Sequence, residues 1–380
     1  MGFTNQQSLI TEAVGNGKTW ETNFYKVGPV EAAGAAGHWY DVSSWGGNPR
    51  PNGYPAGLFS TPLSFNAVNG AICPGPSMLA IGTGTTFSVD SFLRFVDSSL
   101  GFKFAGFHSG MSITVSGFNN SGNNRTFTIA TVTSNLITVT NTNGMIVESN
   151  AGQIITFKSV GSDTKFLTKT TIFSNNANLI NSCFLLCDYL MFYNFFDMSL
   201  SSFQGVTNNT SLQRYASGNG VQMFMVSTND VGSNGSQMVV TYTNSNGVSN
   251  QQSQPVFILP PTTTNISSIP YTGITISPMG FSNGPFIPLA PGDVGVQNIQ
   301  GVQLSSSTGS GYGAIVLAYP LFYINNRSTV APTELEVMID TSKMPQIQDN
   351  AYLNFLMYSG AAIASNSTII GNLEFSWGNL

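Results

Sequence analysis

Charged side chains are scarce in this sequence of 380 residues. Only 8% of the residues are Asp, Glu, Lys or Arg, against about 25% in typical globular proteins. The twelve basic residues are scattered, and no lysine occurs between Thr170 and Ser342. Nucleic-acid binding depends on clustered Lys and Arg that displace counterions from phosphates. The sequence therefore excludes a nucleic-acid partner.

The low charge also predicts association. The net charge of −5 gives little self-repulsion, and between Arg214 and Arg327 the only charged residues are Asp230 and Asp293. A surface with so few charges protects a free monomer poorly against sticking. A subunit whose surface is buried in a permanent assembly avoids that problem, so we expect a homo-oligomer, with a trimer as one possibility.

Long apolar runs are missing as well. The first residues, MGFTNQQSLITEAVGNGK, contain neither a basic region nor an apolar run of the kind found in signal peptides. The most apolar stretch, Cys183–Phe196, is interrupted by Asp188 and Asn194 and is too short for a bilayer span of about 20 residues. We therefore expect a soluble chain, made in a cytoplasm, with no membrane partner.

Cysteine and histidine are too few for a metal centre. The three cysteines, Cys73, Cys183 and Cys187, fit a reducing compartment, and the only histidines are His38 and His108. Cys183 and Cys187 lie four residues apart, beyond disulfide reach if they share a strand. Small buried apolar side chains are the favoured interpretation of all three. We predict no metal and no cofactor.

No residue pattern indicates catalysis. His38 and Asp41 could form a base and its orienting partner, but no GxSxG motif marks a nucleophile. Glu334 and Glu336 point to one face of a strand, and a solvated face of an edge strand is the favoured interpretation. Asp293, between Pro and Gly, is expected in a turn. We predict no catalytic, cofactor-binding or metal-binding residue and no enzymatic activity.

What the sequence does contain is short β-strands. MSITVSGF, RTFTIATVT, NLITVT and GQIITF alternate apolar and polar residues, which is the pattern of half-buried strands. Asn- and Gly-rich segments separate them and favour turns. Four strands in this space predict a small β-sandwich or barrel, inserted at about residues 92–159.

The remaining chain predicts a larger β body. Residues 1–65 are rich in Gly and Pro and are expected to be an extended segment that packs on the body or on a neighbour, with one helical turn at Leu9–Val14. CFLLCDYLMFYNFF is expected to be a strand rather than a helix, with Asp188 and Asp197 accepting backbone N–H bonds. Residues 220–229 and 236–250 are expected to form a hairpin.

Further strands are expected at PVFILPP, in GPFIPLAPGDVGVQNIQGVQLSSS, and at GAIVLAYPLFYI, ELEVMID, AYLNFLMYSG and NLEFSWG. Many short strands without a long helix predict an all-β protein whose main body, residues 66–91 and 160–380, is a jelly-roll-like β-sandwich.

Several motifs occur in an order that resembles a family of tailed-bacteriophage virion proteins. LLCDYLMFYNFFDMS contains a CDYL strand, and LQRYASGNGVQMFMVSTNDVGSNGSQMVVTYTNSNGVSNQ contains the RY-x-SG-x-GV and YTN-x-x-G motifs of that family. GPFIPLAPGDVGVQNIQGVQL, IQDNAYLNFLMYSG, EFSWG and the N-terminal GNGKTWETNFYKV are similar to further segments. The resemblance covers about residues 1–65 and 180–380. Residues 110–157 resemble instead the small Ig-like modules inserted in many phage proteins, although Met111 stands where those modules often carry an acidic residue.

The resemblance implies a virion structural protein, most plausibly a capsid decoration or cement protein that binds the major capsid protein and itself. It supplies no catalytic residues. One alternative is a tail or baseplate protein. Another is a tailspike-type protein that binds a receptor or glycan, with Trp39, Tyr40 and Trp45 as sugar platforms. The sequence leaves open the location in the virion, the capsid sites bound and the role of the inserted module.

Overall fold

The computed structural model describes residues 3, 5–16, 18–28, 36–48, 68–73, 81–82, 87–97, 109, 112–149, 154–157, 163–258, 268–272, 284–328, 330–336, 344–349 and 351–378. These residues form mainly antiparallel β-sheets, so the all-β prediction is confirmed. Within them, helix is limited to α1 (Gln6–Ile10) and to short turns at Thr11–Gly15, Val42–Ser44, Ser121–Asn123 and Ala177–Leu179. None of the described helices has the length and apolarity needed to cross a membrane.

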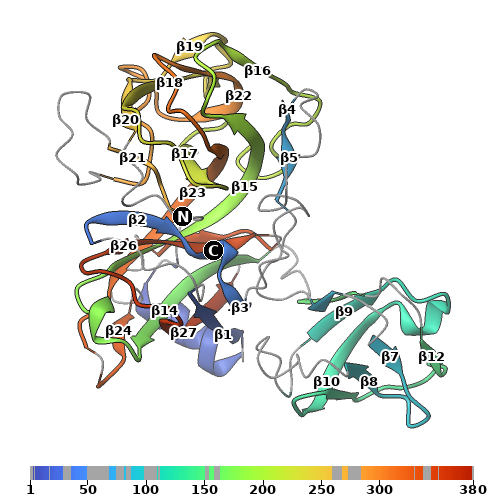
Figure 1. The fold of residues 1–380 in the computed structure, drawn as a ribbon. Coiled ribbons are helices and arrows are strands. Elements are labelled where there is room, and N and C mark those ends of the chain that lie inside the picture. The colour runs from blue at the N-terminus through green and yellow to red at the C-terminus, as the bar shows by residue number, and fades with distance from the viewer. Residues whose placement is uncertain are drawn as a thin grey trace.

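One sheet runs through the centre of the molecule (Figure 1). Its strands in spatial order are β17 (Gln222–Ser227), β23 (Tyr312–Asn325), β15 (Cys183–Asp197), β26 (Leu353–Ser359) and β2 (His38–Asp41), with β5 (Ala71–Ile72) also paired to β15. β15 and β23 pair along nearly their whole length, with three register shifts in β15. The two halves of β15 and β23 pack against different sheets. Each half belongs to one of two bodies, which are called the lower body and the upper body below.

The lower body in Figure 1 packs a second sheet on the half of β15 that contains Cys183–Asp188. This sheet has the order β24 (Thr333–Glu336), β14 (Thr164–Ser174), β27 (Thr368–Gly378), β1 (Thr19–Val27) and β3 (Gly46–Asn48), with β25 (Gln346–Ile347) beside β14. The two layers meet through aromatic side chains, among which Phe24 and Phe355 have ring centroids 4.6 Å apart.

The upper body packs a third sheet on the other half of β15 and on β17. Its strands are β21 (Tyr271–Thr272), β20 (Val256–Ile258), β18 (Ser236–Asn244), β22 (Val296–Leu304), β16 (Gln204–Thr207) and β4 (Val68–Asn69), with β19 (Gln251–Gln252) beside β18. Among the described pairs in this sheet, β16 with β4 is parallel and the others are antiparallel.

β15 is apolar on both faces because both faces are buried. Phe184 and Leu186 enter the core of the lower body, whereas Leu185 and Cys187 enter the core that continues into the upper body. A strand covered on two sides has no polar face and loses the alternation of a half-buried strand. The expectation of a strand at CFLLCDYLMFYNFF is thus confirmed.

The inserted module is a third unit, at the lower right of Figure 1. Its sheet has the order β12 (Glu148–Ser149), β7 (Phe87–Val89), β8 (Phe95–Asp97), β11 (Leu136–Val139), β10 (Thr126–Val132), β9 (Ser112–Ser116), β13 (Ile154–Phe157) and β6 (Ile81–Gly82). All four strands expected between residues 111 and 157 are present. The sheet begins at Ile81, ahead of the expected start at residue 92, because two short strands from the preceding segment pair into it.

The hairpin expected from residues 220–229 and 236–250 is wrong. β17 pairs with β23 in the central sheet, whereas β18 pairs with β22 in the upper sheet. The two strands are neighbours in sequence, but each fills a different layer of the same sandwich. The NSNG turn does form a hairpin, from β18 to β19, with Gly247 at a φ of 77°.

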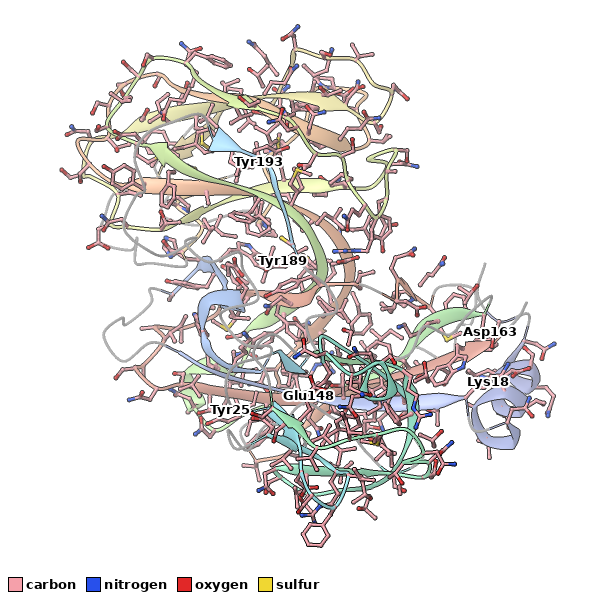
Figure 2. The ribbon with its side chains drawn as sticks, turned by 90° about the vertical axis from the view of Figure 1, so that its right-hand side faces the viewer. Lys18, Tyr25, Glu148, Asp163, Tyr189 and Tyr193 are labelled. Atoms are coloured by element: carbon pink, nitrogen blue, oxygen red, sulfur yellow. The ribbon has the colours of Figure 1, made fainter. Side chains whose placement is uncertain are left out.

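The N-terminal segment is more regular than expected. The helical turn expected at Leu9–Val14 lies in α1 and the turn that follows it, and α1 begins with a capping box between Asn5 and Ser8. β1 then pairs with the C-terminal strand β27 over nine residues. Lys18, just before β1, bridges Glu12 and Asp163, each at 2.8 Å (Figure 2). The segment therefore packs on its own body over the part described.

Candidate functional site

Asp188 and Arg214 form a buried ion pair. The Arg214 Nε donates to Asp188 Oδ2 at 2.8 Å, and its Nη2 donates to Oδ1 at 2.9 Å. The side chains are only 0% and 3% exposed. The same Nη2 donates to the Tyr189 carbonyl, and the Tyr352 N–H donates to Asp188 Oδ1. This fork geometry fixes the chain after β16 against the middle of β15.

The network continues from Tyr189 into the lower body. The Tyr189 hydroxyl donates to Asp41 Oδ1 at 2.8 Å and also lies 3.3 Å from the Phe355 carbonyl oxygen. Asp41 in turn accepts from the N–H of Ser43. Tyr189 lies where the upper and lower bodies meet, while Tyr193 lies in the upper one (Figure 2). Burial raises the pKa of Asp188, and the Arg214 guanidinium opposes that rise.

Lys26 is a buried cation that sequence reasoning missed. Its side chain is 0% exposed, and Nζ donates to the carbonyls of Ser43 and Trp45 at 3.2 and 3.4 Å. Burial lowers its pKa to about 7, and the charge of Asp41 acts in the opposite direction. The sequence did hold a sign of this burial, because Lys26 falls on the inward phase of the alternation in TWETNFYKV.

A second polar clamp holds the upper body. The Tyr242 hydroxyl donates to Asp293 Oδ2 at 2.6 Å, and the Asn244 amide donates to Oδ1 at 2.7 Å. The Ala290 N–H donates to the Tyr242 hydroxyl. Asp293 lies in a turn, as expected, with its N–H bonded to the Ala290 carbonyl. The clamp ties the loop before β22 to the end of β18.

A glycine contact completes this clamp. The Gly220 N–H donates to the Val294 carbonyl, and Asn219 and Gly295 form a β-bridge. Gly218 adopts a φ of 73°, which favours glycine. A Cβ on Gly295 would lie 2.0 Å from the Gly218 carbonyl oxygen, so only glycine allows the two backbones to approach this closely.

The contacts in these clamps join motifs that are far apart in sequence. Asp188 belongs to CDYL and Arg214 to the RY motif, while Tyr242 and Asn244 belong to YTN and Asp293 to the GD motif. In each case the donors and acceptors satisfy one another inside the protein. These groups therefore serve to hold strands and loops in place, which is what buried polar networks do when they are satisfied.

The candidate general base His38 and its expected partner Asp41 do not form a catalytic arrangement. His38 Nδ1 lies 2.8 Å from the Ala36 carbonyl oxygen, and its Nε2 is buried with no hydrogen-bond partner among the described residues. Burial lowers the pKa of His38. Asp41 instead engages Tyr189 and Ser43, because residues three apart on β2 point to opposite faces. His108 lies outside the described residues.

The cysteines are unpaired, as expected. Cys73 and Cys187 are buried and Cys183 is half-buried. Burial raises the pKa of all three thiols, which makes them poor nucleophiles. No group of three or more His, Cys, Asp or Glu that could hold a metal occurs in the part of the chain that the structure describes.

The remaining acidic candidates are structural. Glu334 and Glu336 are exposed on the edge strand β24, where Glu334 pairs with Lys169. The Ser199 N–H donates to Asp197. The expectation that Asp188 and Asp197 accept backbone N–H bonds is therefore confirmed.

The proposed sugar platforms are not available on the surface. Trp39, Tyr40 and Trp45 are 7%, 3% and 3% exposed. A sugar ring stacks on an exposed aromatic face, and these three faces are covered by the chain itself. The interpretation of these residues as glycan platforms is wrong, because Tyr40 and Trp45 pack in the core of the lower body and Trp39 packs in the core that continues into the upper body.

The module is held by carboxylates that accept backbone N–H groups. Glu148 accepts from the N–H groups of Asn119 and Asn120 and from the Asn123 amide. Burial opposes ionisation of Glu148, but these three donors lower its pKa. They join the Asn-rich loop after β9 to β12.

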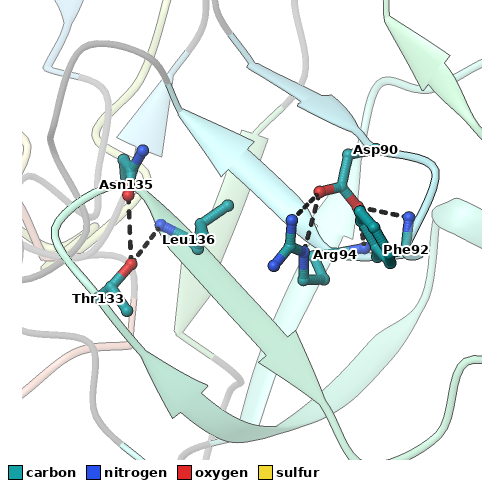
Figure 3. Close-up of polar contacts among 6 residues, drawn as sticks. All are labelled: Asp90, Phe92, Arg94, Thr133, Asn135 and Leu136. Atoms are coloured by element: carbon teal, nitrogen blue, oxygen red, sulfur yellow. Dashed lines mark hydrogen bonds and ion pairs between the residues drawn. The ribbon is translucent and has the colours of Figure 1, made fainter.

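Two turns of the module are braced by their own side chains (Figure 3). Asp90 accepts from the N–H groups of Phe92 and Arg94 and pairs with the Arg94 guanidinium, leaving Phe92 74% exposed. In the other turn, the Leu136 N–H donates to the Thr133 hydroxyl, which also contacts Asn135. The module has few charged side chains, and hydrogen bonds within its turns stabilise it.

Comparison with models of protein families, with curated proteins and with solved structures found no match to this chain.

Proposed function

We propose that this chain is a structural protein of a tailed-phage virion, and specifically a capsid decoration protein that binds the major capsid protein. The observation that carries the proposal is the pairing of the motifs that resemble virion proteins. Asp188 with Arg214, and Asp293 with Tyr242 and Asn244, unite four separate motifs in one buried and one partly buried clamp. Motifs that are used together to build one fold support a common architecture with that family.

The finer fold assignment belongs to the same proposal. The main body is a jelly-roll derivative, supported by strands that pair with partners far away in sequence, such as β1 with β27 and β15 with β26. The module is an Ig-like insert, supported by its antiparallel strands in an order that is not sequential. The low overall charge supports the proposal that this chain is a subunit of a permanent assembly.

The test is reconstitution on capsids. Heads of the phage that encodes this chain would be prepared without it, and the purified chain would be added back. We expect saturable binding to the heads and a higher temperature of DNA release from the decorated particles. The carboxyl-neutral variant Glu336→Gln, on an exposed edge, serves as a folded control.

Two results would contradict the decoration role. One is the absence of binding to heads together with the presence of the chain in purified tails, which would support the tail or baseplate alternative. The other is a temperature of DNA release that does not change after saturating decoration. Degradation of host polysaccharide by the purified chain would instead favour a tailspike-type enzyme, although no observation on the described residues points there.

A further inference from the structure

β23 has two neighbours over only half of its length. Gly313–Ala318 pairs with β17 on one side and with β15 on the other. From Tyr319 to Asn325 the strand pairs with β15 alone. In the described part of the chain, no backbone group bonds to the outer side of this second half. It therefore presents a row of unpaired N–H and C=O groups, which can accept another strand.

Three other edge strands, β17, β2 and β24, are protected against pairing. β17 is covered by chain, since the Ser227 N–H donates to Ser268 and the Ile287 N–H donates to Met223. β2 is covered in the same way, because the Ile269 N–H donates to Trp39. The exposed edge strand β24 carries glutamates, and charged side chains discourage pairing with a second edge.

The open half of β23 lacks charges. The sequence YPLFYIN contains no ionisable acid or base apart from its tyrosines, and Tyr323 is 53% exposed. Leu321 and Phe322 are half-buried against the lower core. Pro320 has no N–H and so limits pairing at one end, but it leaves Leu321–Asn325 able to pair. An edge with these properties favours association over solubility.

We propose that the open half of β23 is a self-association surface, on which the β23 of a second copy pairs antiparallel across a twofold axis. A twofold axis brings the same residues of both copies together, and this segment is compatible with that because it contains no like charges to repel one another. Residues Leu321–Asn325 supply main-chain hydrogen bonds, and the Tyr323 rings add apolar contact. The surface is a property of the chain alone, so it does not depend on the capsid-binding proposal.

The first test is the mass of the purified full chain as a function of concentration, measured by analytical ultracentrifugation. We expect a monomer–dimer equilibrium for the wild type and at least a tenfold weaker dimer for Tyr323→Lys, which places two like charges face to face. The matched control is Tyr25→Lys, at a tyrosine that is 41% exposed on β1, where no change is expected. Tryptophan fluorescence would establish that both variants are folded.

The second test locates the contact. Amide hydrogen exchange of Leu321, Tyr323 and Asn325 would be compared at concentrations below and above the dimer midpoint, and slower exchange is expected above it. The proposal is overturned if the wild type stays monomeric at all concentrations, or if Tyr323→Lys dimerises as well as the wild type. Protection of these amides in a monomer only after capsids are added would assign the edge to a different partner and would also overturn it.

Discussion

At the residue scale, buried ionisable groups fix contacts within the fold. Asp188 and Arg214 neutralise each other, while Lys26 meets backbone carbonyls and the charge of Asp41. In a chain with so few charges, placing them in the interior is costly unless each has partners. The Asp188–Arg214 pair therefore specifies the position of β15 relative to the chain after β16 more than it adds to net stability, and Lys26 fixes β1 against Ser43 and Trp45.

Asp188→Asn should be strongly destabilising. The amide keeps the shape of the carboxylate but leaves the Arg214 guanidinium buried without a counter-charge, which costs about 3–5 kcal/mol in comparable pairs. The free energy of unfolding in urea would measure it. Asp230→Asn, at an exposed aspartate, is the matched control and should change little. Equal effects of the two substitutions would contradict the structural role of the pair.

Lys26 should make stability depend on pH. Its pKa is about 7 in the folded protein and 10.5 when unfolded, so between these values the unfolded chain binds more protons. Stability should therefore rise with pH across this window, by at most about 1.4 kcal/mol per pH unit. Lys26→Met should remove this rise in urea titrations between pH 7 and 9. Lys18→Met, at a half-exposed lysine whose pKa is raised, should retain it.

At the scale of elements, the upper body is held by two loops whose backbones are in contact. The turn before β17 and the turn before β22 meet at Gly218 and Gly295, next to the clamp of Asp293. β15 shows a second element-level device, since its three register shifts let one strand bend from the lower body into the upper one. Both features involve residues far apart in sequence.

Gly295→Ala should destabilise the upper body. The added methyl group would lie 2.0 Å from the Gly218 carbonyl oxygen and 2.8 Å from the Gly220 nitrogen, so one loop must move and lose its bridge. Such overpacking costs about 1–3 kcal/mol. Gly284→Ala, where a Cβ meets nothing within 4 Å, is the control. A wild-type urea midpoint for Gly295→Ala would show that the loops are not in contact.

At the scale of the whole molecule, the shared strands β15 and β23 couple the two bodies. Unfolding of one body therefore disrupts strands that also form the core of the other body. Three of the four tryptophans, Trp20, Trp45 and Trp377, pack in or against the core of the lower body, whereas Trp39 packs in the core that continues into the upper body. In a Trp39→Phe background, tryptophan fluorescence therefore reports on the lower body.

Ile299→Ala in β22 should test this coupling. Ile299 is fully buried in the upper body, and its truncation should cost about 2–5 kcal/mol. If the bodies unfold together, the tryptophan transition of the lower body shifts to lower urea by that amount. The control Gln303→Ala changes an exposed side chain of the same strand, β22, and should leave the transition unchanged. An unshifted tryptophan transition in the Ile299→Ala variant would mean that the bodies unfold independently.

Local sequence patterns were enough to predict most of the long strands and several turns. The alternation in β9, β10 and β11, the unbroken apolar run of β15 and the NSNG turn are local patterns, and local backbone preference is enough to produce them. The roles of Asp188 and Asp197 as acceptors of backbone N–H groups and the turn at Asp293 were also predicted, whereas the contact of Asp293 with Tyr242 and Asn244 was not.

Which elements pair with one another became clear only from the fold. It separated β17 from β18, buried Lys26, covered Trp39 and Trp45, and paired Asp188 with Arg214. Such contacts depend on which sheet edge is free when a strand pairs during folding and on which faces of the sheet are later covered by other elements. Neither property is encoded in a short window of sequence, since the same strand pattern fits either layer of a sandwich.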